Sequence, residues 1–324
     1  MIFKFLIDFF SQSSYRNYIE CCVFIFGLCI GSFLNCVIYR TELQENMPKG
    51  SPRRKAVSFL RGKSFCPHCK HTLSWQDLFP VFSFLFLGGK CRYCRKKISW
   101  QYPIVELFSG LIFLLISNFV IFSKSSVIPS LIGNPGTSQT LWISAFAGMT
   151  SLLFLFYVSS SLIIIFVYDL KHYIIPDKIL FPAIIITLVY RILDFGNLNL
   201  FRIWNLGFWI SAPILNYLLA VLIASGFFLA IFLISRGRAM GFGDVKLAVL
   251  MGFLLGLPNI LVSLFLAFFF GAIIGVILMV FGRKSADWRM KSEIPFGPFL
   301  IAGTFMAMFW GSQIIQWYLH LFLI

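Results

Sequence analysis

The sequence predicts an all-α polytopic membrane protein with about eight transmembrane helices. Of its 324 residues, 59% are hydrophobic and 12% are charged, whereas soluble domains carry roughly 25% charged residues. The apolar residues fall in blocks of about 20, long enough to cross a hydrocarbon core of ~30 Å as a helix. A transmembrane β-barrel is excluded, because its strands would appear as alternating segments of ~10 residues.

Polar breaks divide the apolar blocks into eight predicted spans: 18–39, 103–122, 150–168, 174–193, 213–234, 244–257, 259–281 and 297–319. The first run continues into a basic loop without a small-residue cleavage site. We therefore expect it to remain a span and not a cleaved signal peptide. The sixth span is the shortest and ends before Pro258.

The basic residues predict the orientation, since Lys and Arg are retained on the cytoplasmic side of short membrane loops. With eight spans, 22 of the 27 basic residues fall on one side and five on the other. This split predicts an outside N-terminus and a cytoplasmic location for residues 40–102. The net charge of +15 is thus a topology signal. It fits membrane lipid as a partner, and no nucleic-acid module is indicated.

Three parts follow from this topology. An N-terminal segment with the first helix occupies 1–39, a basic four-cysteine domain occupies 40–102, and a seven-helix membrane domain occupies 103–324. Within the last part, residues 123–147 form a segment rich in Ser, Gly and Pro. They are predicted to form a loop inserted on the outside.

The eight cysteines divide into two groups of four. One group lies in the first span, where cysteine behaves as a small apolar residue. The other forms two C-x2-C pairs, CPHC and CRYC, which are 21 residues apart in the basic segment. Such pairs can supply four thiolates to a structural zinc ion, and the predicted ligands are Cys66, Cys69, Cys91 and Cys94. A redox motif is the weaker alternative, because the βαβ context is absent.

Between the two pairs lies LFPVFSFLFLGG, residues 78–89, which is apolar but too short to cross the bilayer as a helix. We expect this segment to lie on the membrane surface or to form a hairpin into it. The neighbouring His68 and His71 are interpreted as bystanders of the zinc site.

Only 12 acidic residues are present, so each one at a span boundary is a functional candidate. Asp169 closes the third span, and Asp244 opens the sixth within the string GFGD. Both span ends are cytoplasmic in the predicted topology, so the two carboxylates can meet and activate water as in aspartic proteases. Taken alone, Asp244 could simply cap a helix, as Asp177 is expected to do. Glu106 is expected to pair with a Lys or Arg of the basic domain.

Six motifs occur in the order found in one known family: GSFLNCVIYR (31–40), the two cysteine pairs, ISWQYPIVE (98–106), YDLKHYIIPD (168–177), GFGDVKLAVLMG (241–252) and IPFGPFLIAG (294–303). Together they closely resemble the type IV prepilin peptidases of bacteria, which are membrane aspartyl proteases of the GxGD type. The resemblance covers most of the chain outside 1–17 and 123–147.

The resemblance implies a bifunctional enzyme of the bacterial inner membrane whose active site faces the cytoplasm. Its implied substrates are prepilins or pseudopilins of type IV pili and type II secretion. The basic leader would be cleaved after a Gly, and the new N-terminus would be methylated with S-adenosylmethionine. The family's catalytic aspartates fall on Asp169 and Asp244, the pair chosen above from topology. Methyl transfer is associated with the N-terminal half, where no glycine-rich cofactor loop is present.

Two other functions fit part of the pattern. An ion-coupled transporter could use Asp169 and Asp244 as a relay, but these acids lie at one membrane face and no inverted repeat is visible. A zinc-stabilised scaffold without catalysis would explain the cysteines and leave the paired aspartates unexplained.

Overall fold

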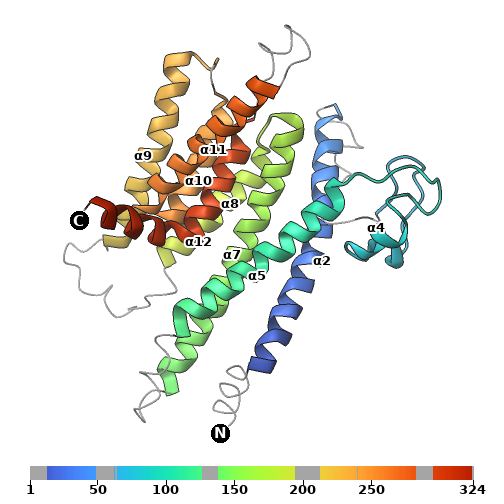
Figure 1. The fold of residues 1–324 in the computed structure, drawn as a ribbon, viewed down its shortest axis with the longest axis horizontal. Coiled ribbons are helices and arrows are strands. Elements are labelled where there is room, and N and C mark those ends of the chain that lie inside the picture. Colours follow the sequence, from blue (N-terminus) through green and yellow to red (C-terminus); the bar gives the residue numbers. More distant parts are fainter. Residues whose placement is uncertain are drawn as a thin grey trace. The chain divides into compact units, whose positions relative to one another are not determined.

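The computed structural model of the chain describes residues 13–48, 62, 64–125, 138–193, 212–238, 240–281 and 295–322. Helices form almost all of the regular structure in these ranges, and two isolated β-bridges adjoin the cysteine pairs. Figure 1 labels the helices along the chain. By their internal contacts, residues 1–164 and 165–324 form two compact units. The predicted all-α membrane fold is confirmed.

The first unit holds α2 (Ser13–Glu45), η1 (Trp75–Leu78), α4 (Phe82–Phe86), α5 (Gln101–Ser125) and most of α7 (Ser138–His172). The long helices α2 and α5 pack side by side. A Cβ atom on Gly31 would lie 2.7 Å from the Cα atom of Glu106, so a side chain at Gly31 would force the two helices apart. Small residues at contacts of this kind are typical of helix packing in membranes.

The second unit holds the end of α7 together with α8 (Asp177–Leu193), α9 (Ala212–Ser235), α10 (Phe242–Leu255), α11 (Asn259–Phe281) and α12 (Gly297–Phe322). Helix α10 contacts each of α8, α9, α11 and α12, and most of its residues are buried. Its closest approach is to α9, where a Cβ atom on Gly252 would lie 2.6 Å from the Cα atom of Val221.

All eight predicted spans coincide with helices. Among the described residues, six helices are long and apolar enough to cross a membrane: α2, α5, α7, α9, α11 and α12. Helices α8 and α10 have 17 and 14 residues and are shorter than the usual span. The 14 residues of α10 extend roughly 21 Å, less than a hydrocarbon core of about 30 Å.

The end of α10 explains how a helix this short is tolerated in the fold. The guanidinium group of Arg191, from α8, donates hydrogen bonds to the carbonyl oxygens of Phe253 and Leu254. The side chain of Asn216, from α9, bonds both the amide and the carbonyl of Leu257 at 3.0 Å. Neighbouring helices thereby supply the partners that the exposed backbone of a short helix needs in a membrane.

The two largest differences from the predicted boundaries are at the end of α2 and the start of α7. Helix α2 continues to Glu45, because no Gly or Pro interrupts it before Pro48, and Arg40 on this extension donates to the carbonyl of Gly62 at 2.8 Å. Helix α7 begins at Ser138, inside the segment 123–147 that was predicted as a loop. The turn-forming residues of that segment end before Ser138, and the apolar sequence that follows favours a helix. Residues 126–137 lie outside the described residues.

Candidate active site and cysteine cluster

The four predicted zinc ligands come together in the first unit. The Sγ atoms of Cys66, Cys69, Cys91 and Cys94 all lie within 4.8 Å of one another, and those of Cys66 and Cys94 are 3.9 Å apart. A tetrahedral zinc ion with Zn–S bonds of ~2.3 Å requires S–S separations of roughly 3.8 Å. The donor set and its spacing therefore fit a metal ion bound by four thiolates.

Two similar turns build this cluster. In the first, the amide of Cys66 donates to the carbonyl of His71, and in the second the amide of Cys91 donates to Lys96, both at 2.9 Å. The residue after each second cysteine, Lys70 or Arg95, has a positive φ of 59° or 58°. The cysteine pairs are thus an internal structural repeat, although the sequences around them differ.

The ionisation of the cysteine thiols also favours binding of a cation. Burial raises the pKa of the Cys66 thiol, but hydrogen bonds from the backbone amides of Cys69 and His68 outweigh burial and lower it to about 7. The amide of Lys96 lowers the pKa of Cys94, yet burial and the neighbouring thiols raise it to about 11. Four negatively charged thiolates at these distances repel one another. A bound divalent metal ion would relieve that repulsion.

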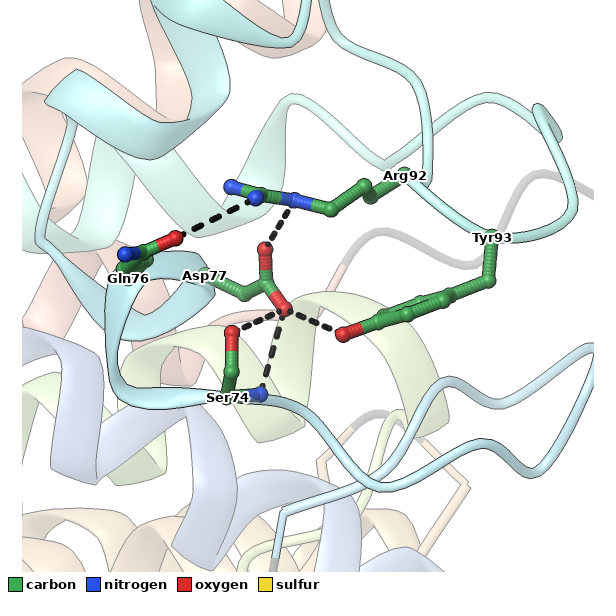
Figure 2. A network of polar contacts seen from close by, with 5 residues as sticks. All are labelled: Ser74, Gln76, Asp77, Arg92 and Tyr93. Carbon is green, nitrogen blue, oxygen red and sulfur yellow. Dashed lines mark hydrogen bonds and ion pairs between the residues drawn. The ribbon is translucent and has the colours of Figure 1, made fainter.

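A polar network joins η1 and the preceding Ser74 to the second cysteine turn (Figure 2). The Asp77 carboxylate accepts hydrogen bonds from the hydroxyl of Ser74 at 2.9 Å and of Tyr93 at 3.2 Å. Its other oxygen lies 2.8 Å from Nε of Arg92, whose Nη1 reaches Gln76 at 3.3 Å. Burial raises the pKa of Asp77, but the bonds from Ser74 and the Arg92 charge outweigh it and lower the pKa.

Among the residues that the structure describes, Glu106 does not form the expected ion pair with a Lys or Arg. Its carboxylate instead accepts a hydrogen bond from the backbone amide of Val81 at 2.8 Å and another from the Ser32 hydroxyl. Val81 precedes α4 and has a φ of 61°, unusual for a β-branched residue. Glu106 therefore fixes the chain between the cysteine pairs to α5, and a backbone amide replaces the cation that was expected.

The two predicted catalytic aspartates lie together in the second unit. Asp169 is in the last turn of α7, which ends as the amide of Tyr173 bonds the Asp169 carbonyl at 2.9 Å. Asp244 is in the first turn of α10. Their exposed fractions are 4% and 8%, and they are near enough for the charge of Asp169 to act on Asp244.

The capping role considered for Asp244 is present as well. Its carboxylate accepts a hydrogen bond from the amide of Gly241, which precedes α10. This is the bond that an acid in the first turn makes in a capping box. Gly243 brings α10 close to the segment after α7, because a Cβ atom there would lie 3.2 Å from Cβ of Ile175. Capping thus holds the Asp244 carboxylate in place beside Asp169 and does not compete with that pairing.

The sequence analysis missed Gly297, at the start of α12. Its amide donates a hydrogen bond to the Asp169 carboxylate, and a Cβ atom on Gly297 would collide with Oδ2 of Asp169. No other residue fits this position without displacing the carboxylate. The string IPFGPF, in which Pro295 and Pro298 lie on either side of Gly297 before an apolar run, marks an unusual backbone position. It does not indicate which side chain Gly297 approaches.

Asp177 lies outside the aspartate pair. It begins α8, and both of its carboxylate oxygens bond Nζ of Lys246, at 2.8 and 2.9 Å. This ion pair joins α8 to α10, and the Lys246 ammonium also lies over the rings of Phe181 and Phe242. Asp177 therefore neutralises the cation nearest to Asp244 in sequence.

Two buried carboxylates in such proximity can perform acid–base chemistry. They repel each other when both are ionised, which favours a state in which one proton is shared. The ionised group can then take a proton from a water molecule, and the protonated group can give one to a leaving amine. Hydrolysis of an amide requires these two proton transfers.

Comparisons with known proteins agree with this geometry. The family model "Bacterial Peptidase A24 N-terminal domain" matches residues 25–120, and "Type IV leader peptidase family" matches residues 156–276. The four cysteines fall in the first match, and both aspartates fall in the second. No solved structure matches the chain.

Curated relatives named prepilin leader peptidase/N-methyltransferase match over nearly the whole length. The protein of Legionella pneumophila is 30% identical over 91% of this chain and 92% of its own. That of Aeromonas hydrophila is 29% identical over 93% and 94%, and that of Bacillus subtilis (strain 168) is 28% identical over 92% and 97%. The chain therefore belongs to the type IV leader peptidase family.

Proposed function

We propose that this protein is a membrane aspartyl endopeptidase that removes the leader of prepilins or pseudopilins, with Asp169 and Asp244 as the catalytic residues. The observation that carries the proposal is the pairing of two buried carboxylates from α7 and α10 within one compact unit. The names of the relatives, which cover more than 90% of the chain, support prepilins as the substrate class.

In this proposal one carboxylate acts as a general base toward water and the other as a general acid toward the leaving amine. The Gly297 amide holds the Asp169 carboxylate, and the Gly241 amide holds that of Asp244. Two fixed carboxylates need little reorganisation during proton transfer, which is how a positioned acid and base lower a barrier.

The side of the membrane follows from the positive charges. The unequal distribution of Lys and Arg, 22 against five, supports an active site that faces the cytoplasm of a bacterial inner membrane. A cytoplasmic site would meet a basic leader before the pilin is exported. The cleavage position proposed is the bond after a Gly, as the family resemblance implies.

Two further properties complete the proposal. Cys66, Cys69, Cys91 and Cys94 bind a structural zinc ion, as their spacing and mutual distances support. The N-terminal half participates in methylation of the new N-terminus with S-adenosylmethionine as the methyl donor, which the names of the relatives support.

The test is incubation of the purified full-length protein with a prepilin whose basic leader ends in Gly and is followed by Phe, with and without S-adenosylmethionine. Mass spectrometry should find a product that begins at the Phe. With the methyl donor present, that product should carry the added mass of one methyl group.

A matched substrate in which the Gly is replaced by a bulky residue should remain uncut. Cleavage at another position, or equal cleavage of both substrates, would contradict the proposed specificity. Cleavage without any methyl incorporation would contradict the second activity alone.

A further inference from the structure

The segment between the cysteine pairs exposes large apolar side chains. We call residues 75–87, which contain η1 and α4, the aromatic hairpin. Phe86 is 87% exposed, Trp75 is 73% exposed and Leu85 is 63% exposed. Phe79 and Phe82 are also more than half exposed. A contiguous group of exposed apolar side chains on one short segment indicates a surface that is covered in the working protein.

The aromatic hairpin is attached to a helix that crosses the membrane. The amide of Val81 bonds the carboxylate of Glu106 at 2.8 Å, and Glu106 is in the second turn of α5. The buried ring of Phe84 packs against Trp100, just before α5, with ring centroids 4.9 Å apart. Since α5 is a candidate span from its first residue, these contacts hold the hairpin at the level where α5 enters the bilayer.

The residues around the hairpin are strongly basic. Among the described residues between 62 and 100, the basic side chains are all exposed: Lys70, Lys90, Arg92, Arg95, Lys96 and Lys97. The one acidic residue in that part, Asp77, is already paired with Arg92. A complex of one zinc ion with four thiolates carries two net negative charges. The net charge of this region stays positive even when they are included.

An open pocket of about 460 Å³ lies within the hairpin, where the apolar and basic groups meet. Its walls include Trp75, Phe79, Phe82 and Phe86, and Arg92 is at its edge. Arg92 uses Nε for Asp77 and Nη1 for Gln76, which leaves Nη2 available to another acceptor. A guanidinium group is well suited to a phosphate oxygen.

We propose that the aromatic hairpin is a lipid-binding element that docks on anionic phospholipid at the membrane surface. The exposed rings enter the boundary between headgroups and acyl chains, Arg92 binds a lipid phosphate, and the surrounding lysines face the anionic headgroups. Apolar side chains beside basic ones are the usual composition of such interfacial elements. A four-cysteine domain held in this way would have a fixed orientation at the bilayer.

The choice of lipid over a protein partner rests on the anchor and the charge. The contacts to Glu106 and Trp100 place the hairpin where the first available surface is the bilayer of α5. If the hairpin bound the hairpin of a second copy of this chain, the basic residues of the two copies would face and repel each other.

The test uses the full-length protein in nanodiscs of phosphatidylcholine, with or without phosphatidylglycerol, and with lipids brominated near the headgroup. The measured quantity is tryptophan fluorescence. The contribution of Trp75 is the difference in quenching between wild type and Trp75→Phe, which keeps an aromatic ring at this position. In anionic nanodiscs Trp75 should be quenched by the brominated lipid and shielded from acrylamide in water. Replacing Lys96 and Lys97 with Gln should weaken docking about fivefold for each charge removed.

Matched variants separate docking from folding. Phe86→Ser should reduce the quenching of Trp75, whereas Phe86→Leu should preserve it. Trp310, a side chain of the span α12, serves as the reference. Its quenching, obtained as the difference between wild type and Trp310→Phe, should not depend on the anionic lipid. Exposure of Trp75 to acrylamide without quenching by lipid would overturn the proposal. Shielding from both quenchers would overturn it too, because a protein surface would then cover the hairpin.

Discussion

The cysteine cluster and the aspartate pair are built in opposite ways. The cluster uses two copies of one short turn, and all four thiols come from residues 66–94. The aspartate pair uses the end of α7 and the start of α10, and its third contributor, Gly297, begins α12. A metal site can therefore be encoded by local spacing, whereas the carboxylate pair depends on the packing of a whole unit.

The surroundings of the two sites differ as well. The cysteine turns are rich in exposed cations and are braced by the network around Asp77. The aspartates are buried and receive backbone amides from neighbouring segments. We expect the first region to respond to loss of its metal or its ion pairs, and the second to respond to small displacements of backbone.

Apart from changes at the two aspartates themselves, the largest effect is expected from Gly297→Ala. The added methyl group would collide with the Asp169 carboxylate and must displace it. Misplacement of a catalytic group by about 1 Å can cost roughly 10²-fold in rate. The measurement is the initial rate of prepilin cleavage. The matched control is Gly275→Ala in α11, where a Cβ atom meets nothing within 4 Å. A wild-type rate in Gly297→Ala would show that this contact does not position the catalytic group.

Cys66→Ser should remove the zinc and loosen the four-cysteine domain. A structural tetrahedral site contributes folding energy directly, and Cys66 is one of the two buried cysteines of the proposed site. Metal analysis of the purified protein and thermal unfolding would measure the loss. Cys29→Ser, which changes an exposed cysteine of α2, should retain the metal. Equal zinc contents in the two variants would argue against the site.

Asp77→Asn should lower the stability of the four-cysteine domain by about 1–3 kcal/mol, since the bonds from Ser74, Tyr93 and Arg92 lose a charged partner. The lowered pKa of Asp77 means that its contribution is complete above the usual pKa of about 4 and is lost as the pH falls through the lower native value. Resistance of bound zinc to a chelator reports this stability. If zinc in the variant resisted the chelator as well as zinc in the wild type, the network around Asp77 would not stabilise the metal site.

The smallest effect is expected from Asp177→Asn. The Asp177 carboxylate is 53% exposed and its Lys246 partner 24% exposed, so the ion pair contributes less than about 1 kcal/mol. The melting temperature should change little, and cleavage should continue. Loss of cleavage as complete as that from a change at Asp244 would place Asp177 in the catalytic pair.

The helices and the two sets of site residues were predictable because each has a local signal. Apolar blocks marked the spans, C-x2-C spacing marked the thiols, and scarce acids at span ends marked Asp169 and Asp244. The roles of Glu106 and Gly297 were not predictable. Each depends on a backbone amide that tertiary packing brings to a carboxylate, and no spacing rule relates residue 81 to 106 or residue 169 to 297.

The most direct test of the central claim is the rate of leader cleavage by purified Asp169→Asn and Asp244→Asn, with bound zinc measured in the same samples. An amide cannot exchange protons as a carboxylate does, so each variant should lose activity by at least about 10²–10⁴-fold. Both should keep the zinc content of wild type, because the cysteine cluster is a separate site. Cleavage at the wild-type rate by either zinc-loaded variant would contradict the assignment of these two residues as the catalytic pair.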